Sequence, residues 1–381
     1  MSKARELAEL GAVYDSGALS NRNLIINGAM TVAQRYTSVN EINETNDGYW
    51  TTDRWKNIGT GTSGKVNMSQ DTDAPDGFKY STKFAVHTAD SVIGSTEAWR
   101  VEQHIEAGSL RHLNYGVGST TGKKITLSFW VKSNLTGNWS VGLYMDSTSG
   151  GTTTNKENSQ TYTINSANTW EYKTLTFIPN TDTNMNSTDN DHGLRLWFHL
   201  AAGSDYTSGT ANVWGDPTHR AVGHAVNFFS STSNTWQYTG VQLEVGESAT
   251  PFEHRSFADE LQRCKRYFQK IISSSSETSL NFGTGQAFGS SSAYIFNELP
   301  VTMRAKPSLS NSISALGNLG SMTSSGGGMG ISALAIVTAW SSADRVTATL
   351  TVASGSFTAG QVAELNAGGV NGAFIAYDAE L

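Results

Sequence analysis

Hydrophobic and polar residues alternate with a period of two in several segments between residues 23 and 255. In KITLSFWVKS, for example, Ile125, Leu127, Phe129 and Val131 fall on one face, which is typical of a β-strand with one buried face. The strands predicted in this way are residues 124–133, 139–145, 170–178, 194–201 and 236–245. Polar, turn-forming segments separate them, so the pattern favours an antiparallel β-sandwich or jelly roll over a parallel α/β sheet.

A second β-rich region follows residue 273. Alternation and β-branched residues predict strands at residues 293–296, 332–340, 346–352 and 373–378. Charged residues are sparse in this region, and small residues dominate it. We therefore expect a smaller C-terminal β-domain that places much of its surface in a subunit interface.

The first residues show helical rather than strand periodicity. In KARELAEL (3–10) the apolar residues recur at helical spacing, and Gly11 is suited to end a helix. A helix of eight residues is marginal by itself in water. Two interpretations stay open: an attachment or trimerisation helix ordered by a partner, or a frayed terminus.

A second helix is expected where the two β regions join, over residues 256–272. Ser256 is a good N-cap residue, and Asp259 stands at the third position of a capping box. The apolar residues of this segment recur at spacings of four and three and form a heptad seam; they are Phe257, Leu261, Cys264, Phe268 and Ile271. The seam is compatible with a three-helix junction on a trimer axis and with one helix packed on its own chain.

These patterns divide the chain into four parts. Residues 1–22 form an N-terminal attachment segment, and residues 23–255 form the jelly-roll β-sandwich. Residues 256–272 form a linker or trimerisation helix, and residues 273–381 form the C-terminal β tip domain. The predicted fold class is therefore mainly β, with two short helices, in a homotrimer.

Charge and cysteine content narrow the classes of function. The formal net charge of −7 argues against a nucleic-acid partner, because phosphate binding needs clustered cationic side chains. Cys264 is the one cysteine, so neither an internal disulfide nor a cysteine-based metal site is expected. The N-terminus has no apolar signal segment, and no run has the length of a membrane span. We expect synthesis in the cytoplasm, without a signal peptide or membrane insertion.

Several segments resemble proteins of bacteriophage and prophage tails. NLIINGAMTVAQR (23–35) and DRW (53–55) resemble the opening of a carbohydrate-binding-type jelly roll in tail proteins. GVQLEVGESATPFEHRSFADELQRCKRYFQK (240–270) resembles the last strand of that module and the helix after it. LPVTMRAKPSL (299–309) and YDAEL (377–381) resemble later parts of the same proteins. The chain is thus similar to the tail fibre, or receptor-binding, protein family.

The resemblance implies a homotrimeric fibre protein of the virion tail. It implies that the N-terminus attaches to a tail or baseplate protein and that the protein adheres to a host surface polysaccharide such as lipopolysaccharide. It implies no catalytic residues, because the motifs of this family are structural. A purely structural tail component is an alternative.

A polysaccharide depolymerase tailspike is the other alternative. Hydrolysis of a glycosidic bond needs two carboxyl groups at a controlled separation. Candidate carboxyl groups are those of Asp53, Glu97, Glu102, Asp189 and Asp191. The stacked short repeats of long β-helical depolymerases are missing, and we expect a protein that is not an enzyme.

Glycan recognition needs aromatic rings that stack on sugar faces and planar polar groups that bind hydroxyls. Trp214, Tyr206, His219 and Arg220 lie together in loop-like sequence and are candidates for such a site. The Gly- and Ser-rich segments 321–330 and 353–360 are further candidate contact surfaces.

One segment could hold a structural calcium ion. Asn186, Asp189 and Asp191 offer the hard oxygen ligands that calcium prefers, although a solvated turn is the simpler interpretation. No other cofactor is expected. The eight histidines are scattered, and we expect them to lie at the surface.

Overall fold

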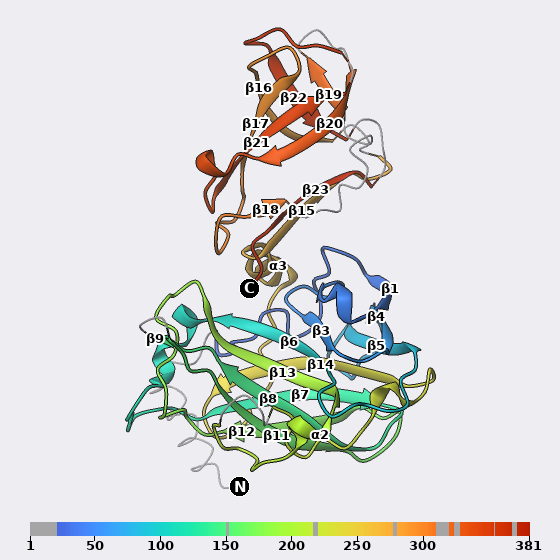
Figure 1. The fold of residues 1–381 in the computed structure, drawn as a ribbon, viewed down its shortest axis with the longest axis vertical. Helices are drawn as coiled ribbons and strands as arrows, with labels where there is room; N and C mark the ends of the chain where they lie inside the picture. Colours follow the sequence, from blue (N-terminus) through green and yellow to red (C-terminus); the bar gives the residue numbers. More distant parts are fainter. Residues whose placement is uncertain are drawn as a thin grey trace. The chain divides into compact units, whose positions relative to one another are not determined.

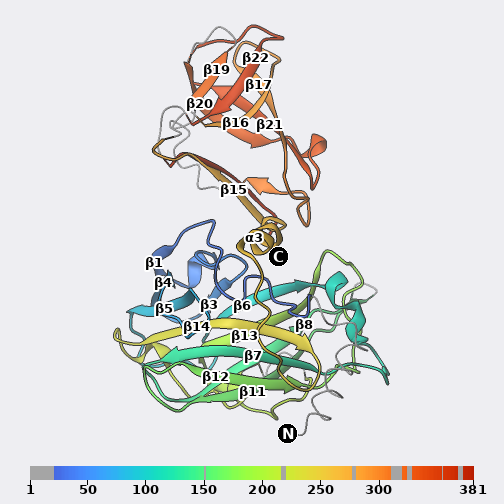
Figure 2. The same cartoon turned by 180° about the vertical axis from the view of Figure 1, so that it is seen from behind.

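The computed structural model describes residues 21–149, 152–215, 220–276, 280–309, 320–323, 328–353, 355–367 and 372–381. The chain divides into two compact units between Glu260 and Leu261, which lies inside the segment 256–272. Figures 1 and 2 show the strands of both units from opposite sides. The helix expected at residues 3–10 lies outside the described residues. Among the described residues, no helix is long and apolar enough to cross a membrane.

The first unit is built from two six-stranded antiparallel sheets. Sheet A has the order β1 (Ser38–Ile42), β4 (Lys65–Asp71), β5 (Ser81–Thr88), β14 (Thr235–Val245), β7 (Ile125–Ser133) and β12 (Glu171–Phe177). Sheet B has the order β11 (Lys156–Ile164), β8 (Gly137–Met145), β13 (His192–Ala202), β6 (Ala98–Glu106), β3 (Lys56–Thr60) and β2 (Gly48–Tyr49). The predicted antiparallel β-sandwich is confirmed.

Short elements join these strands. They are η1 (Glu44–Asn46), η2 (Ala107–Leu113), β9 (Thr148–Ser149), β10 (Thr152–Thr153), α2 (Ser204–Thr207) and η3 (Phe228–Ser230). Each of the five strands predicted in this unit is present, with ends within two residues of the prediction. Hydrophobic alternation predicted these strands correctly because one face of each strand packs into a single core.

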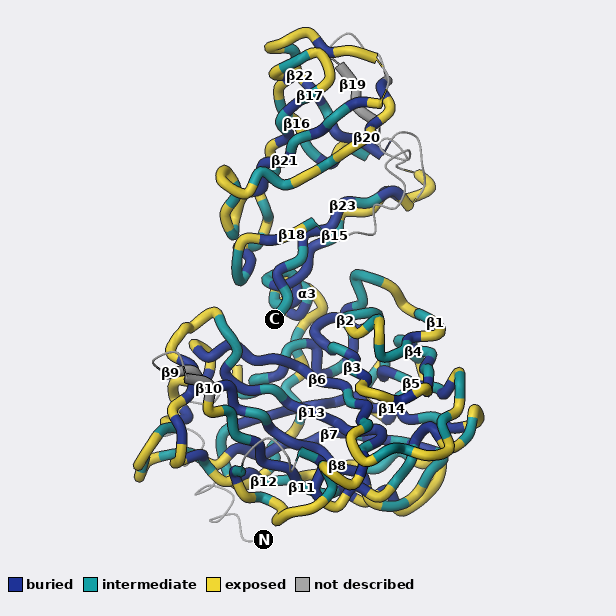
Figure 3. The backbone as a smooth tube through the Cα atoms, viewed as in Figure 1, coloured by how far each residue is buried: buried dark blue, intermediate teal, exposed yellow. Residues whose placement is uncertain are grey.

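Aromatic side chains fill much of that core. Trp236 stacks on Tyr238 with ring centroids 4.8 Å apart, and Trp55 meets Tyr238 edge-on at 5.1 Å. Phe129 and Phe198, from opposite sheets, meet at 5.0 Å. All five side chains are fully buried, and Figure 3 shows the same burial along the inner strands. Rings of this size account for much of the apolar area removed from water.

The segments that resemble tail proteins hold the ends of the first unit together. The side-chain amide of Asn27 donates to the carbonyl of Asp53, 3.0 Å away. The guanidinium of Arg255 donates to the carbonyls of Asn23 and Ile25 at 2.6 and 3.1 Å. These motif residues close the sandwich.

The second unit contains a closed barrel and a small sheet. The barrel order is β16 (Asn281–Ala287), β17 (Ser292–Glu298), β21 (Arg345–Val352), β20 (Gly328–Ile336), β19 (Gly320–Thr323) and β22 (Val362–Asn366). The sheet order is β15 (Phe268–Ile272), β23 (Phe374–Asp378) and β18 (Ser308–Leu309). Each barrel strand pairs with two neighbours in this order.

One predicted strand of this unit is wrong at its end. Residues 332–340 were expected to be a single strand, but β20 stops at Ile336 and η5 (Thr338–Trp340) follows. The N–H of Trp340 donates to the carbonyl of Val337 at 3.1 Å, which closes a turn. This turn takes Trp340 out of the strand.

The helical seam is also wrong in its second half. Helix α3 spans Phe257–Lys265, and Ser256 is its N-cap: the N–H of Asp259 donates to Oγ of Ser256, which donates to Oδ2 of Asp259. The helix then ends, and Phe268 and Ile271 lie in β15, paired with Asp378 and Ile375 of β23. β-branched and aromatic residues favour a strand when a partner edge is available, and sequence spacing does not show that edge.

The three helical positions of the seam differ in burial. Phe257 is 60% exposed, Leu261 is half-buried and Cys264 is fully buried. The expected continuous apolar stripe from Phe257 to Ile271 is therefore absent. Trimerisation stays a prediction based on the resemblance.

Candidate functional site

The outward face of sheet B carries a concentration of polar and aromatic side chains. Along β13, Leu194, Leu196 and Phe198 point into the core, so Arg195 and Trp197 fall on the opposite face. In the sheet register, Trp197 lies opposite Glu102 of β6, and Arg195 lies opposite His104 of β6 and Tyr144 of β8. The pairing of β6, β13 and β8 thus brings these side chains together.

Two rings form the centre of this face. Tyr144 and Trp197 stack with ring centroids 4.9 Å apart and an angle of 24°. The Arg195 guanidinium lies over the Tyr144 ring at 4.8 Å, and the Arg100 guanidinium lies over the Trp197 ring at 4.7 Å. Arg220 lies 5.7 Å from the centroid of Trp197. We call this arrangement of planar groups the sheet B ladder.

Ion pairs fix the cationic members of the ladder. Arg195 binds Asp146 through two hydrogen bonds, of 2.9 and 2.5 Å. Nε of Arg100 donates to Glu102 at 2.9 Å. A bidentate guanidinium–carboxylate pair fixes both position and orientation, so the ladder is preorganised.

His104 is the second partner of the Glu102 carboxylate, through its Nε2. Burial disfavours the ionised form of Glu102, yet Arg100 and His104 together hold the pKa of this carboxyl well below its usual range. Burial lowers the pKa of His104 to about 4, although Glu102 opposes the change. Glu102 is therefore ionised and His104 neutral near pH 7.

A loop covers one end of the ladder. Arg220 lies over the ring of Tyr206 at 4.6 Å, and its Nε is 3.7 Å from Glu157 of β11. The N–H of Ala221 donates to the carbonyl of Tyr206, and the N–H of Val222 donates to Oγ of Ser159 of β11. The loop after residue 220 is thus tied both to α2 and to sheet B.

Glu157 lies in a poorly hydrated position beside this loop. Burial raises the pKa of its carboxyl to about 7, and Arg220 and Arg100 only partly oppose the change. Within the described residues, neither carboxylate oxygen of Glu157 has a hydrogen-bond partner, and the same holds for Nε1 of Trp197 and both ring nitrogens of His199. Buried polar atoms without such partners are uncommon and often mark functional positions.

The structure brings together two of the four predicted glycan-binding residues. Tyr206 and Arg220 are in contact, as described above. Trp214 is only 7% exposed; its Nε1 donates to the carbonyl of Ile178 at 2.8 Å, and its ring packs edge-on against Tyr115. Its burial leaves no open ring face for a sugar, so this part of the prediction is corrected. His219 lies outside the described residues.

The predicted calcium ligands point to different partners. Arg111 of η2 donates to Oδ1 of Asp189 at 2.8 Å and to the carbonyls of Asn186 and Ser187 at 2.9 and 2.7 Å. Oδ1 of Asp191 accepts the N–H of His192. Of the three side chains that were expected to bind calcium, the guanidinium of Arg111 thus binds that of Asp189. Within the described residues, no cluster of three or more His, Cys, Asp or Glu side chains is arranged to hold a metal ion.

Three histidines expected at the surface are buried. They are His104, His199 and His224. Nδ1 of His224 accepts the N–H of Ser140 at 3.1 Å, and Nε2 lies 2.8 Å from the carbonyl of Val226. Strand alternation in β6 and β13 could have predicted that His104 and His199 point away from the core. No local sequence pattern predicts that a loop packs over that face and buries them.

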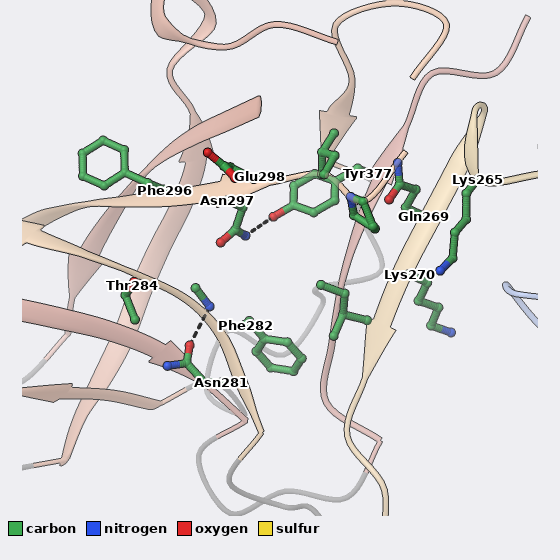
Figure 4. A pocket seen from close by; sticks show the side chains of 14 residues that line it. Lys265, Gln269, Lys270, Asn281, Phe282, Thr284, Phe296, Asn297, Glu298 and Tyr377 are labelled. Atoms are coloured by element: carbon green, nitrogen blue, oxygen red, sulfur yellow. Dashed lines mark hydrogen bonds between the residues drawn. The ribbon is translucent and has the colours of Figure 1, made fainter. Parts of the chain in front are cut away.

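A pocket of about 310 Å³ lies in the second unit, between the barrel and the small sheet (Figure 4). Its lining includes Phe296, Asn297 and Tyr377. The side-chain amide of Asn297 donates to the hydroxyl of Tyr377. Of the candidate tip segments, residues 324–327 and 354 lie outside the described part of the chain.

Comparisons with known proteins find similar structures but no family. No family model and no curated protein matches the chain. One similar structure is the enzymatically active domain of tailspike protein 4 of bacteriophage CBA120, with 14% identity, a TM-score of 0.29, and coverage of 58% of this chain and 21% of that chain.

Two carbohydrate-binding modules are also similar in structure. A CBM4 module shows 16% identity and a TM-score of 0.29, over 58% of this chain and 98% of the module. The family 11 module of the Clostridium thermocellum cellulase Lic26A-Cel5E shows 13% identity and a TM-score of 0.28, over 54% of this chain and 95% of the module. These identities and TM-scores are too low to support an inference about function.

Proposed function

We propose that the first unit binds a cell-surface polysaccharide on the outward face of sheet B, and that the protein is an adhesin of a phage-type tail. The sheet B ladder is the observation that carries this proposal. The resemblance of residues 23–35 and 240–270 to tail fibre proteins supports the location in the virion tail. Homotrimerisation and attachment through the N-terminus belong to the same proposal.

Trp197 is only 3% exposed and stacks within the ladder, so the groups that can reach a polyhydroxylated ligand are the polar members around it. The side chains of Arg195 and Arg220 keep about a fifth of their surface exposed, at 23% and 22%. Their planar N–H groups donate in pairs, and the Tyr144 ring lies between Arg195 and Trp197 in the row of stacked groups. Because ion pairs and stacking already hold these groups, little side-chain entropy is lost when a ligand binds.

The carboxyl groups of this face favour binding over hydrolysis. Glu102 lies on β6 and Glu157 on β11, which are separated by β13 and β8. Three strand spacings place their backbones about 14 Å apart. Glycosidases need carboxyl groups about 5–9.5 Å apart. We therefore propose a binding protein that needs no cofactor.

The test measures adhesion of the purified full-length chain. Probes are intact cells and purified lipopolysaccharide of the bacterium that carries the encoding phage or prophage. Replacing Arg220 by Ala should weaken binding about tenfold, because a charge-assisted hydrogen bond is lost. Lys124→Ala, at an exposed position paired with Glu247, is the matched control and should bind as wild type.

Three results would count against the proposal. Equal binding by the Arg220→Ala and Lys124→Ala variants would exclude sheet B as the contact surface. Release of reducing ends from the polysaccharide would favour a depolymerase instead. Adsorption that antibodies against the protein leave intact would support a structural tail component.

A further inference from the structure

Three aromatic rings form a row on the outward face of the barrel in the second unit. Phe288 follows β16, Tyr294 lies in β17 and Trp340 lies in η5. The rings of Phe288 and Tyr294 stack with centroids 4.2 Å apart at 24°. The rings of Tyr294 and Trp340 lie 4.8 Å apart at 58°. We call these three residues the aromatic row.

Strand alternation and short neighbours place the row outside the barrel. Ala293 and Ile295 of β17 are buried in the barrel core, so Tyr294 between them faces outward. Thr349 of β21 is the register partner of Tyr294. A threonine is short, so the Trp340 side chain can reach Tyr294 across β21. The Thr347 hydroxyl donates to the carbonyl of Trp340 and holds its backbone to this strand.

The rings of the row are unusually open to solvent. Trp340 is 55% exposed and Phe288 is 47% exposed. The other nine tryptophans of the chain are buried or half-buried. Aromatic side chains normally account for a large share of buried apolar area, so an exposed cluster points to a contact surface.

The surroundings of the row carry few charges and many hydrogen-bonding groups; the ammonium of Lys306 donates to the carbonyl of Thr338, two residues before Trp340. The register partners of Tyr294 are Gln286 of β16 and Thr349 of β21. The charged pair on this face, Glu298 with Arg345 at 3.8 Å, lies at the other end of β17. Rings interleaved with hydroxyl and amide groups suit a sugar, which offers a C–H face and a rim of hydroxyls.

The same face continues toward the pocket of the second unit. Phe296, two residues after Tyr294 on the outward face of β17, lines that pocket. Figure 4 shows Thr284, Asn281 and Asn297 around it. Amide and hydroxyl groups therefore follow the aromatic row at one end.

We propose that the aromatic row is a second carbohydrate-binding site, which takes a neutral hexopyranose oligosaccharide. Trp340 and Phe288 supply open ring faces, and Gln286 and Thr349 supply partners for hydroxyls. This site is separate from the sheet B ladder, because every residue in it belongs to the second unit. The two sites can fail or succeed independently.

The chain itself provides a selective probe of this site. Trp340 is the one tryptophan after residue 236. We would label the full-length protein with 5-fluorotryptophan and assign the Trp340 fluorine resonance by its loss in the Trp340→Phe variant. The probes are cellohexaose, maltohexaose and mannohexaose at millimolar concentration, a range typical of weak single-site binding.

The expected result is a saturable shift of the Trp340 resonance with at least one of the three oligosaccharides. Tyr294→Ala should weaken that binding about tenfold, because one stacked ring is lost. Thr351→Ala, on the same face of β21, and Arg220→Ala, on the sheet B ladder, should leave it unchanged.

Two outcomes would overturn the inference. One is a Trp340 resonance that does not move with any of the three probes. The other is a Trp340 resonance that changes on dilution together with the sedimentation coefficient, which would show that the row is a contact between copies of this chain.

Discussion

The backbone N–H of Asn27 donates a hydrogen bond of 2.6 Å to Oε1 of Glu260, a residue 233 positions later in the chain. The same carboxylate lies 3.6 Å from the guanidinium of Arg255. All three residues belong to segments that resemble tail proteins, and this contact joins the segment before β1 to helix α3. These motif residues thus stabilise the first unit.

Removing this carboxylate should destabilise the first unit. Glu260→Ala leaves the buried N–H of Asn27 without an acceptor, so we expect the free energy of unfolding to fall by about 2 kcal/mol. Tryptophan fluorescence during urea unfolding reports this unit, because nine of the ten tryptophans precede residue 237. Glu260→Gln keeps an acceptor oxygen, so its free energy of unfolding should fall by less. Equal losses in both variants would show that charge, rather than the hydrogen bond, matters.

Glu157 should make the first unit less stable as the pH rises. Its pKa is raised to about 7 from an ordinary 4.5, so the folded state binds a proton that the unfolded state releases between these values. Ionisation in the folded state is then disfavoured by about 3 kcal/mol in total. Relative to wild type, Glu157→Gln should therefore gain stability between pH 4.5 and pH 7. A stability difference that stays constant over this range would contradict the raised pKa.

The buried histidines should make the first unit less stable as the pH falls below 6.5. Burial lowers the pKa values of His104 and His224 to about 4, so the unfolded state protonates first as the pH falls. Each histidine should reduce the free energy of unfolding by about 1.4 kcal/mol per pH unit between its ordinary pKa and its folded pKa. In the His224→Gln variant, unfolding should take up about one proton fewer, so the free energy of unfolding should depend less steeply on pH. Urea titrations at several pH values measure the slope, and an unchanged slope in the variant would refute the assignment.

The segment 186–191 should need no calcium, because Arg111 supplies the positive charge that pairs with Asp189. We expect EDTA to leave the melting temperature of the first unit unchanged. Arg111→Ala removes the partner of Asp189 and of two carbonyls and should lower stability by about 1 kcal/mol, since the pair is partly exposed. Added calcium should not protect the wild-type protein. A rise in melting temperature with calcium, reversed by EDTA, would instead support the predicted metal site.

The sequence alone predicted five strands of the first unit, β7, β8, β12, β13 and β14, and the core side chains of β7. Ile125, Leu127, Phe129 and Val131 alternate with polar residues, and all four are fully buried. The N-cap at Ser256 could also be predicted from the sequence, because its partner, Asp259, is only three residues away. Such signals are local: side-chain period and capping depend on neighbours in the chain.

Tertiary structure alone decided the functional surfaces. Trp197 meets Tyr144 because β13 pairs with β8, and Phe288 meets Tyr294 through the β16–β17 hairpin of the barrel. β15 replaced the second half of the predicted helix because β23, about a hundred residues later, offers it a strand edge. Trp214 turned out buried and Asp189 paired with Arg111 for the same reason. Which distant segments come into contact depends on the packing of the whole fold, and one-dimensional spacing does not encode that pairing.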